Sequence, residues 1–581
     1  MRPMALVLTL LRLLLWPVGA FVRKLRSRHP ARYVFLKVPA DLPQFSAARR
    51  WWERWRIGRG SGLVGQSSLE DLEALFQQAG GDSRVRGLVL VWSPLRCGWN
   101  VAGALRRSVL ALRGQDKEVV VYLPKGGGDR DLYVATAADR VFVSPGSSLD
   151  LLGCATEQLY VPELLGRVGV GVQVNAQGDF KTAAERFVAQ EMSSFQREQL
   201  VALLQSRQDL LCEGLAQKMG KEHSPAQLFE EVWLSPERAR EVGLVDAACY
   251  EDALPRKLGQ EALGARWAVT AQAYRGMHGQ SPLRALRGGQ VLARLDLRGM
   301  IREGAGRRAG IGGGIGLGDT VANLRSLAEN RQVAGVLMCV DSPGGSALVS
   351  DLIHHEVVQL AARKPVVAFF GGVAASGGYY IAAPCQQIIA SPETMTGSIG
   401  VVSMRVMIEE LLRKLGVRSQ VVQTAPHADM MRLTRGWTAE EMALVERESQ
   451  RIYHRFLQVV TEGRQLDFEH VRSCAGGRVW TAVAAKERGL VDEVGDLDVA
   501  LRTLRREAGD FPLKRVPHRA ESGLVLPADE EPAGDLLGLL AGLPEPLGEW
   551  AMQAVAHLVG GGRPGPAERV LCFCPLAGQL R

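Results

Sequence analysis

The sequence lacks the features that mark nucleic-acid-binding and disulfide-stabilised proteins. Its formal charge of +8 is small for 581 residues, the arginines are dispersed, and no zinc-finger or RNA-recognition pattern accompanies them. We therefore expect no nucleic acid as a partner. The nine cysteines are odd in number and scattered, and several lie in apolar segments, so we expect buried free thiols and not a disulfide framework.

Two further absences argue against a metal or a phosphate-containing cofactor. Cys572-Phe573-Cys574 does not have the usual spacing of zinc ligands. The glycine-rich segment from Arg302 to Gly318 is not followed by the G-K-[ST] sequence of a phosphate-binding loop, so it is interpreted as a flexible loop. We expect no metal and no cofactor.

The N-terminal segment from Met4 to Val22 is apolar. At about 1.5 Å per residue, a helix of this length nearly spans the roughly 30 Å hydrocarbon core of a bilayer. Arg12, near its middle, weakens insertion, but the leucines, valines and phenylalanine around it offset that cost. We expect a membrane anchor; a cleaved signal peptide and a helix lying in the membrane interface remain open.

Beyond residue 30 the chain repeats itself. Lys117–Tyr122 matches Lys364–Phe369 at an offset of 247 residues (364 − 117), and Trp233 matches Trp480 at the same offset. Each copy alternates short apolar strands with helical segments, which predicts βαβ crossovers and a largely parallel sheet. A chain this long exceeds one core, so two large domains are expected.

Ser376 lies at a predicted strand-to-helix turn. Pro365–Phe370 before it is a short apolar run that indicates a buried parallel strand, and a short helix is expected after it. Flanking glycines allow a sharp turn that brings backbone amides close to a ligand. A nucleophile and a helix-capping serine both fit this stretch taken alone. The G-x-S-x-G elbow of α/β-hydrolases is absent, because Ala374 stands two residues before the serine.

A second glycine-rich turn follows the apolar strand Gln332–Val340, with the sequence Asp341-Ser342-Pro343-Gly344-Gly345-Ser346. The backbone amides of Gly344 or Gly345, together with that of Gly377, are candidates for an oxyanion hole. Two such turns 31 residues apart (376 − 345) are much more specific than either one.

These motifs resemble those of the signal peptide peptidase A (SppA) family, in its long two-repeat form, within the ClpP/crotonase superfamily. The family's D/N-S-P-G-G-S, A-S-G-G-Y and T-G-S-I-G patterns are all present, the last as Thr396-Gly397-Ser398-Ile399-Gly400. The resemblance implies an α/β fold of two tandem ClpP/crotonase-like repeats with parallel sheets and flanking helices, plus the N-terminal hydrophobic helix.

The first repeat lacks the candidate nucleophile of the second repeat, and it carries a lysine that the second repeat lacks. Asp129 corresponds to Ser376 at the repeat offset, whereas Lys181 corresponds to Ala428. The segment from Gly178 to Glu185 matches the family's lysine motif, so the resemblance implies that Lys181 is the general base. An exposed lysine at a helix start is the alternative.

The resemblance also implies that Ser398 hydrogen-bonds to the lysine and orients it, although an ordinary turn serine beside Gly397 is the alternative. A lysine base must lose its proton, and its ordinary pKa is about 10.4, so burial has to lower that value. None of the ten histidines lies in a motif near Ser376, which favours lysine over a Ser-His-Asp triad.

The expected organisation is an N-terminal anchor or signal segment at 1–30, the lysine-bearing repeat at 31–275, a linker at 276–290, the serine-bearing repeat at 291–506 and a Pro/Gly/Leu-rich tail at 507–581. The resemblance implies a serine endopeptidase at the inner membrane, with its body on the periplasmic side. Its implied partners are apolar peptides such as cleaved signal peptides and further copies of the chain, as a homotetramer.

Three questions stay open at this point. Basic residues from Arg23 to Arg28 favour a cytoplasmic body by the positive-inside rule, against the family's topology. A crotonase-type acyl-thioester enzyme would share the fold and the oxyanion glycines without needing the serine and the lysine. A catalytically inactive scaffold would keep the repeats alone.

Overall fold

The computed structural model describes residues 33–44, 68–92, 94–261, 267–277, 289–303, 314–516 and 570–573. The expected N-terminal helix at Met4–Val22 and most of the expected linker at 276–290 lie outside these ranges. Among the residues that are described, no helix is both long enough and apolar enough to cross a bilayer.

The first repeat is built on a six-stranded parallel sheet. Its strands run in the order β10 (Ala268–Thr270), β1 (Tyr33–Val38), β2 (Gly87–Trp92), β3 (Glu118–Leu123), β5 (Arg140–Val143) and β9 (Ala247–Ala248). Alternate residues face opposite sides, so Leu88 packs into one core and Val89 into another. Both faces are buried, which explains why these strands are continuously apolar.

The second repeat has the same strand order. The parallel strands are β22 (Leu513–Arg515), β11 (Val291–Arg298), β14 (Val333–Ser342), β16 (Val366–Ala375), β17 (Gln387–Ala390) and β21 (Glu493–Val494). At the far end of β16 the sheet continues through β18 (Met395–Gly397) to β20 (Val479–Thr481). Because β22 lies beyond residue 506, this sheet includes the beginning of the expected tail.

The duplication extends to single hydrogen bonds. In the first repeat the backbone N–H of Val141 donates to Asp246 Oδ2 at 2.7 Å. In the second repeat Ile388 N–H donates to Asp492 Oδ2, also at 2.7 Å. Val141 and Ile388 are 247 residues apart and the two aspartates 246 (388 − 141 and 492 − 246), so these pairs are equivalent positions of one repeated unit.

The helices flank the sheets. In the first repeat they are α3 (Leu69–Gly80), α4 (Trp99–Arg113), α5 (Asp129–Ala135), α6 (Pro162–Val168), η1 (Thr182–Ala184), α7 (Glu185–Val188), α8 (Ser194–Ala216), α9 (Pro225–Glu231), α10 (Pro236–Glu241), η2 (Glu251–Ala253), α11 (Leu254–Lys257) and α12 (Ala271–Met277). In the second they are α13 (Leu317–Glu329), α14 (Ala347–Ala361), α15 (Gly377–Ala382), α16 (Glu409–Lys414), α17 (Ala439–Arg464), α18 (Phe468–Cys474), α19 (Ala482–Glu487) and α20 (Leu497–Ala508).

Two smaller sheets complete the fold. One consists of β4 (Gly127–Gly128), β6 (Leu149–Asp150) and β8 (Trp233–Leu234). The other combines both repeats, in the order β13 (Ile315–Gly316), β12 (Ile301–Arg302), β15 (Gly344–Ser346), β23 (Val570–Phe573), β19 (Val401–Met407) and β7 (Gly171–Gln177). Because β7 belongs to the first repeat, this second sheet joins the two halves beside the glycine turn that contains Gly344 and Gly345.

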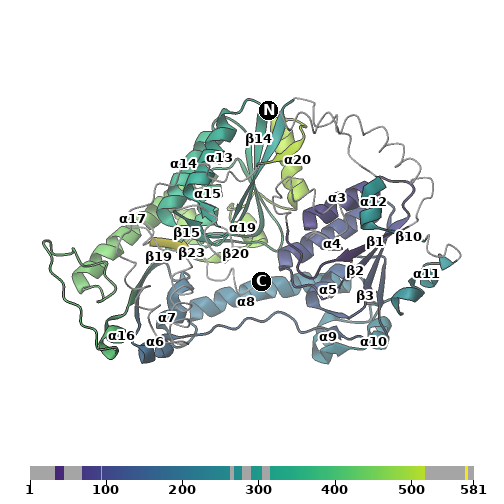
Figure 1. The fold of residues 1–581 in the computed structure, drawn as a ribbon, viewed down its shortest axis with the longest axis horizontal. Helices are drawn as coiled ribbons and strands as arrows, with labels where there is room; N and C mark the ends of the chain where they lie inside the picture. The colour runs from purple at the N-terminus through teal and green to yellow at the C-terminus, as the bar shows by residue number, and fades with distance from the viewer. Residues whose placement is uncertain are drawn as a thin grey trace.

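The long helix α8 also connects the repeats. It extends across the lower middle of the view in Figure 1, between α7 and α5. On its way it contacts the second repeat, where Val479 N–H donates to Gln199 Oε1 at 2.7 Å and Arg478 pairs with Glu198 at 2.8 Å. These contacts fix the position of the first repeat against β20.

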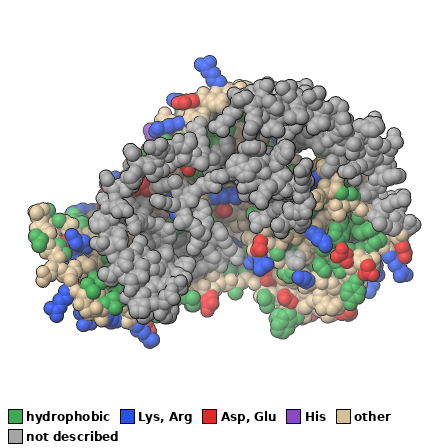
Figure 2. Space-filling model, viewed as in Figure 1, with side chains coloured by type: hydrophobic (Ala, Val, Ile, Leu, Met, Phe, Trp, Pro, Cys, Tyr) green, Lys and Arg blue, Asp and Glu red, His purple; other side chains and the backbone are tan. Residues whose placement is uncertain are grey.

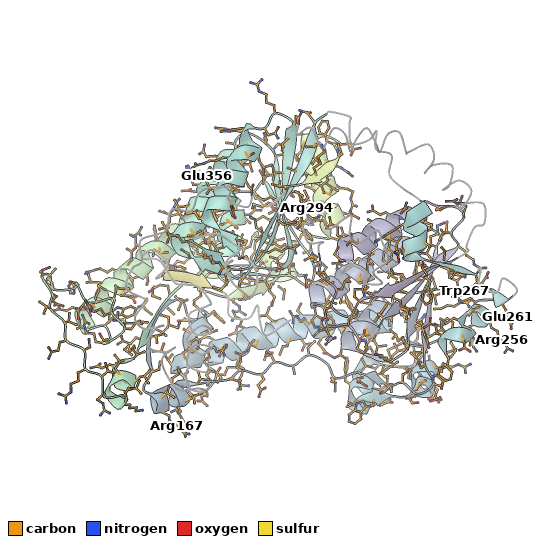
Figure 3. The ribbon with its side chains drawn as sticks, viewed as in Figure 1. Arg167, Arg256, Glu261, Trp267, Arg294 and Glu356 are labelled. Atoms are coloured by element: carbon orange, nitrogen blue, oxygen red, sulfur yellow. The ribbon has the colours of Figure 1, made fainter. Side chains whose placement is uncertain are left out.

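Buried ion pairs hold the interface between the repeats. Arg294 on β11 lies near the centre of the molecule (Figure 3), 2.8 Å from Asp296 on its own strand and 2.8 Å from Glu70 on α3. Arg107 on α4 pairs with Glu393 of the second repeat at 2.8 Å. Removing one member of such a pair leaves an uncompensated charge, so these contacts fix how the repeats are placed.

Basic side chains gather at the end of the molecule where α6 and α16 lie, at the lower left of Figure 2. Among them, Lys414 donates to the carbonyl of Arg167 at the end of α6. The seven cysteines from Cys97 to Cys474 are all free and five of them are buried, which confirms the expectation of buried thiols for that part of the chain.

Candidate active site

Lys181 of the first repeat meets Ser376 of the second. The lysine Nζ lies 2.9 Å from Ser376 Oγ, 3.0 Å from Ser398 Oγ and 2.9 Å from the Ser398 carbonyl oxygen. Lys181 is 3% exposed and both serines are 0% exposed. Three side chains that are far apart in sequence therefore form one buried cluster, with the amine between two hydroxyls.

Ser376 is the single residue between β16 and α15. Its backbone has φ 55° and ψ −121°, a combination that L-residues rarely adopt, and its N–H donates to the Gly397 carbonyl at 2.8 Å. The strand thus ends at the serine and the helix starts directly after it. The sharp turn expected from the sequence is present, with the hydroxyl at its apex.

Ser398 reaches the cluster through strand register. β18 pairs in parallel with β16, with Ala374 opposite Thr396 and Ala375 opposite Gly397. The next residue on each strand is a serine, so the register alone places Ser398 beside Ser376. A φ of 51° and a hydrogen bond from its N–H to the Arg478 carbonyl at 2.7 Å then fix its orientation.

The antiparallel pairing of β7 with β19 positions Lys181 in the cluster. The register places Gln177, at the end of β7, opposite Val401, at the start of β19. Lys181 follows β7 by four residues and Ser398 precedes β19 by three, so the two end regions meet. The tight loop between them needs Gly178, whose φ is 99° and whose added β-carbon would lie 2.4 Å from Gly476.

A glycine that the sequence interpretation did not single out also shapes the lysine's position. A β-carbon on Gly477, which has φ 82°, would lie 2.6 Å from the Cβ of Lys181. The preceding Gly476 accepts from Phe180 N–H at 3.0 Å and donates its own N–H to Tyr453 Oη at 3.1 Å. The adjacent Gly476-Gly477 pair is a signal of close backbone approach, but it lies in a loop 100 residues beyond Ser376.

The glycine turns line the other side of the serine. Gly345 has φ 154°, and a β-carbon on it would lie 1.9 Å from the Ile301 carbonyl oxygen, so only glycine fits there. Gly377 is the first residue of α15, where backbone N–H groups have no partner inside the helix. Its added β-carbon would lie 3.3 Å from Gly344 Cα, which places the two glycine turns in contact.

The backbone amide of Gly344, unlike those proposed for Gly345 and Gly377, is used inside its own turn. Its N–H donates to Ser342 Oγ at 3.1 Å, inside the turn. The structure thus brings together all six predicted site residues, and it leaves the amides of Gly345 and Gly377 as the better placed candidates for holding an oxyanion.

The equivalent place in the first repeat is filled by a carboxylate. Asp129 begins α5 as Ser376 precedes α15, and Asp131 accepts from Trp92 Nε1 at 2.8 Å, Leu95 N–H at 2.9 Å and Gly128 N–H at 2.9 Å. Burial raises the pKa of Asp131, although these donors oppose the shift. The Leu95 amide, in the turn that corresponds to the Gly344 turn of the second repeat, is therefore occupied by the chain itself.

Among the described residues, no three His, Cys, Asp or Glu side chains are grouped so that they could hold a metal ion. The chemistry available at the cluster is that of a hydroxyl, an amine and backbone amides. Such a set is suited to acyl transfer through a serine nucleophile.

Comparison with known proteins agrees with this chemistry. The model of "Peptidase family S49" matches the chain twice, at residues 111–263 and 358–509. The chain is 30% identical over 454 residues to the chloroplastic serine protease SPPA of Arabidopsis thaliana, covering 77% of this chain and 67% of that protein. It is 30% identical over 477 residues to Protease 4 of Salmonella typhi, with 77% and 73% covered.

Another relative is matched over a shorter stretch at higher identity. The putative signal peptide peptidase SppA of Enterococcus faecium is 37% identical over 188 residues, which is 32% of this chain and 55% of that protein. A solved structure, a ClpP1 point mutant from Listeria monocytogenes, covers 36% of this chain and 94% of its own, at 14% identity and a TM-score of 0.24, too low to compare the folds in detail.

The site and the relatives define a serine protease. The chain belongs to peptidase family S49, which confirms the resemblance to the SppA family.

Proposed function

We propose that the protein is a membrane-associated serine endopeptidase in which Ser376 is the nucleophile and Lys181 the general base. The observation that carries this proposal is the 2.9 Å distance between Lys181 Nζ and Ser376 Oγ, both of them buried. A crotonase-type enzyme would not need that contact, and an inactive scaffold would not need to keep it.

The first step is attack on the peptide carbonyl. Neutral Lys181 takes the proton of Ser376 as the Oγ bonds to the carbonyl carbon, and the amides of Gly345 and Gly377 donate to the oxygen that becomes negative. Burial disfavours the ammonium form of a lysine, because a charge loses its hydration there. Ser398 holds the amine in line with the nucleophile through the 3.0 Å hydrogen bond.

The second step releases the amine product. The Lys181 ammonium gives its proton to the leaving nitrogen as the C–N bond breaks, which leaves an acyl ester on Ser376. A water molecule then attacks the ester, with Lys181 again accepting a proton and returning it to Ser376 Oγ. The amine is restored to its starting form at the end of each cycle.

The proposed substrates are apolar peptides such as cleaved signal peptides. Support comes from the name of the Enterococcus relative and from an apolar cluster that begins two residues after Lys181 in sequence. This cluster comprises Ala183, Ala184 and Val402, with Val174, Phe187 and Met404 packed against them. An apolar cluster beside the site suits an apolar peptide.

We also propose that the body is exported to the periplasmic side of the inner membrane, stays attached to it through the N-terminal segment, and assembles as a homotetramer. The motivation is the resemblance to the SppA family and the apolar segment from Met4 to Val22. Protease added to spheroplasts of an expressing host should degrade the body. Full protection before lysis would contradict export.

The catalytic proposal is tested by hydrolysis of a short apolar fluorogenic peptide. Ser376→Ala should abolish activity, and Lys181→Ala should lower it by at least about a hundredfold, the share usual for a general base. The matched control is Ser473→Ala, an exposed serine on α18, which should keep wild-type activity. Gel filtration should show the same oligomer for all three variants. Wild-type activity in Lys181→Ala would contradict the assignment of the base.

A further inference from the structure

The strands β15 and β19 that flank the catalytic cluster are separated by the width of one strand, and β23 fills that gap. β23 pairs antiparallel with β15, with Ser346 opposite Leu571 and Gly345 opposite Cys572. On its other side it pairs antiparallel with β19, with Val402 again opposite Leu571. Figure 1 shows β23, in yellow, between these two strands.

Both flanking strands lead to the catalytic residues. β15 contains Gly344 and Gly345 of the oxyanion turn, and β19 begins three residues after Ser398. At the end of β23, Phe573 lies opposite Gly344, which is in contact with the turn that follows Ser376. A chain lying in this slot therefore runs beside the glycine turn that contacts Gly377, the residue after Ser376.

Without β23, the two flanking strands would present unpaired backbone groups toward each other. An extended peptide is well suited to such edges, because it gains main-chain hydrogen bonds on both sides regardless of its sequence. The slot holds a single strand, so a substrate that pairs with β15 and β19 has to take the place of Val570–Phe573.

We propose that Val570–Phe573 occupies the substrate-binding slot of the catalytic site and is a built-in competitor of peptide substrates. This inference rests on the proposed function, because it assigns the slot to the substrate of the same Ser376. The segment is covalently attached to the enzyme, so its binding is intramolecular and its occupancy does not change with protein concentration.

The kinetic test compares two substitutions at one position. Leu571→Pro removes a backbone N–H and fixes φ, so it should prevent pairing. Leu571→Ala keeps the N–H and is the matched control. For an apolar fluorogenic peptide, the proline variant should lower KM several-fold with kcat unchanged, and the alanine variant should change KM less. Equal KM values in wild type and Leu571→Pro would overturn the proposal.

A second measurement does not need catalysis, so it separates this proposal from the proposed function. Amide hydrogen exchange is followed in Ser376→Ala with and without Leu571→Pro. The amides of β15 and β19 that point toward β23 should exchange faster when the proline is present, whether or not the wild type hydrolyses peptides. Unchanged exchange would overturn the proposal even if peptide hydrolysis by Ser376 is established.

Two further results would contradict a built-in competitor. If the KM effect fades as the protein is diluted, the segment comes from a second copy. If intact-mass analysis of the wild type shows that residues beyond 573 are lost, and Ser376→Ala retains them, the segment is a substrate of the site. Concentration-independent KM values and an intact wild-type chain support the proposal.

Discussion

A β-carbon on Gly477 would lie 2.6 Å from the Cβ of Lys181, so the glycine of one repeat sets the main-chain position of the lysine of the other. The backbone N–H of Gly477 also donates to the Ile399 carbonyl at 2.8 Å, next to Ser398. Gly477 therefore contacts both the segment that carries Lys181 and the segment that carries Ser398.

Gly477→Ala should lower kcat by at least about tenfold, because the added methyl group pushes the Lys181 main chain away from Ser376, and small displacements at a reacting pair are costly. Gly476→Ala is the matched control: its φ of 67° brings similar strain, but nothing lies within 4 Å of an added β-carbon. Kinetics on the apolar peptide decide between them. Equal losses in both variants would mean that backbone strain, not contact with the lysine, is responsible.

Ser398→Ala should reduce kcat by roughly tenfold to a hundredfold without abolishing activity. A hydrogen bond to an amine that becomes charged is worth about 1.5–3 kcal/mol, and the Ser398 carbonyl, 2.9 Å from Nζ, remains in the variant. Ser403→Ala on β19 removes a buried hydroxyl that meets Ser449 and not the lysine, and it should leave kcat nearly unchanged. Complete inactivation by Ser398→Ala would point to a direct catalytic part for that hydroxyl.

The rate should rise with pH, because Ser376 is activated only when Lys181 has lost its proton. The half-maximal point of kcat/KM should lie above about 6.5, the ordinary pKa of a histidine, and below about 10.4, that of an exposed lysine, since burial disfavours the charged amine. The measurement is a pH–rate profile with chemistry shown to be rate-limiting. A profile that is flat from about pH 6 to about pH 9 would contradict a lysine base.

Much of the local structure could be predicted from sequence periodicity. The apolar run expected as a strand at Gln332–Val340 is β14, Val333–Ser342, and the predicted helix after Ser376 is α15. β16 is longer than Pro365–Phe370 indicated, because it continues through Gly371 and Gly372 to Ala375.

Contacts between the repeats explain that extension. A β-carbon on Gly371 would lie 2.3 Å from the Gln44 side chain, and one on Gly372 would lie 3.1 Å from Asn100, both in the first repeat. These glycines admit neighbouring side chains and do not end the strand. Such a role depends on residues far away in sequence, so periodicity could not reveal it.

The sequence predicted which residues would form the cluster but not what places them there. Each repeat lacks the reactive residue that the other carries: the first has Asp129 where the second has Ser376, and the second has Ala428 where the first has Lys181. This pattern pointed to a site shared by both repeats. The β7–β19 pairing that brings the halves together is non-local. The pairing of β23 is equally non-local, and its only signal is four apolar, strand-favouring residues within a Pro/Gly/Leu-rich tail.

The interface between the repeats should become less stable as pH rises through neutrality. Glu73 lines a cavity of about 80 Å³ with Arg107, Asp496 and Asp498, and burial raises its pKa to about 7, with the two aspartates adding to the shift. A carboxyl with a raised folded-state pKa stabilises below its unfolded value near 4.5, and that contribution is lost as pH rises to about 7.

Glu73→Gln removes this ionisation and should raise the free energy of unfolding relative to wild type more at pH 8 than at pH 5, by an amount on the order of 1–3 kcal/mol. Thermal or urea unfolding at both pH values measures the difference. The control is Glu163→Gln on α6, an exposed glutamate that should behave alike at both. If Glu73→Gln stabilises the protein equally at pH 5 and pH 8, a raised pKa of Glu73 in the folded protein is contradicted.

The most direct test of the Ser376–Lys181 pair is covalent labelling of the serine by a fluorophosphonate, followed by intact mass and peptide mapping. Lys181→Met keeps the length of the side chain and removes the amine. Lys117→Met is matched to it, because Lys117 Nζ donates to the carbonyls of Asp82 and Val85 at 2.8 Å, away from the site. The account predicts one label on Ser376 in wild type and Lys117→Met, and labelling slowed at least about a hundredfold in Lys181→Met. Labelling of Lys181→Met at the wild-type rate, or of a serine other than Ser376, would contradict it.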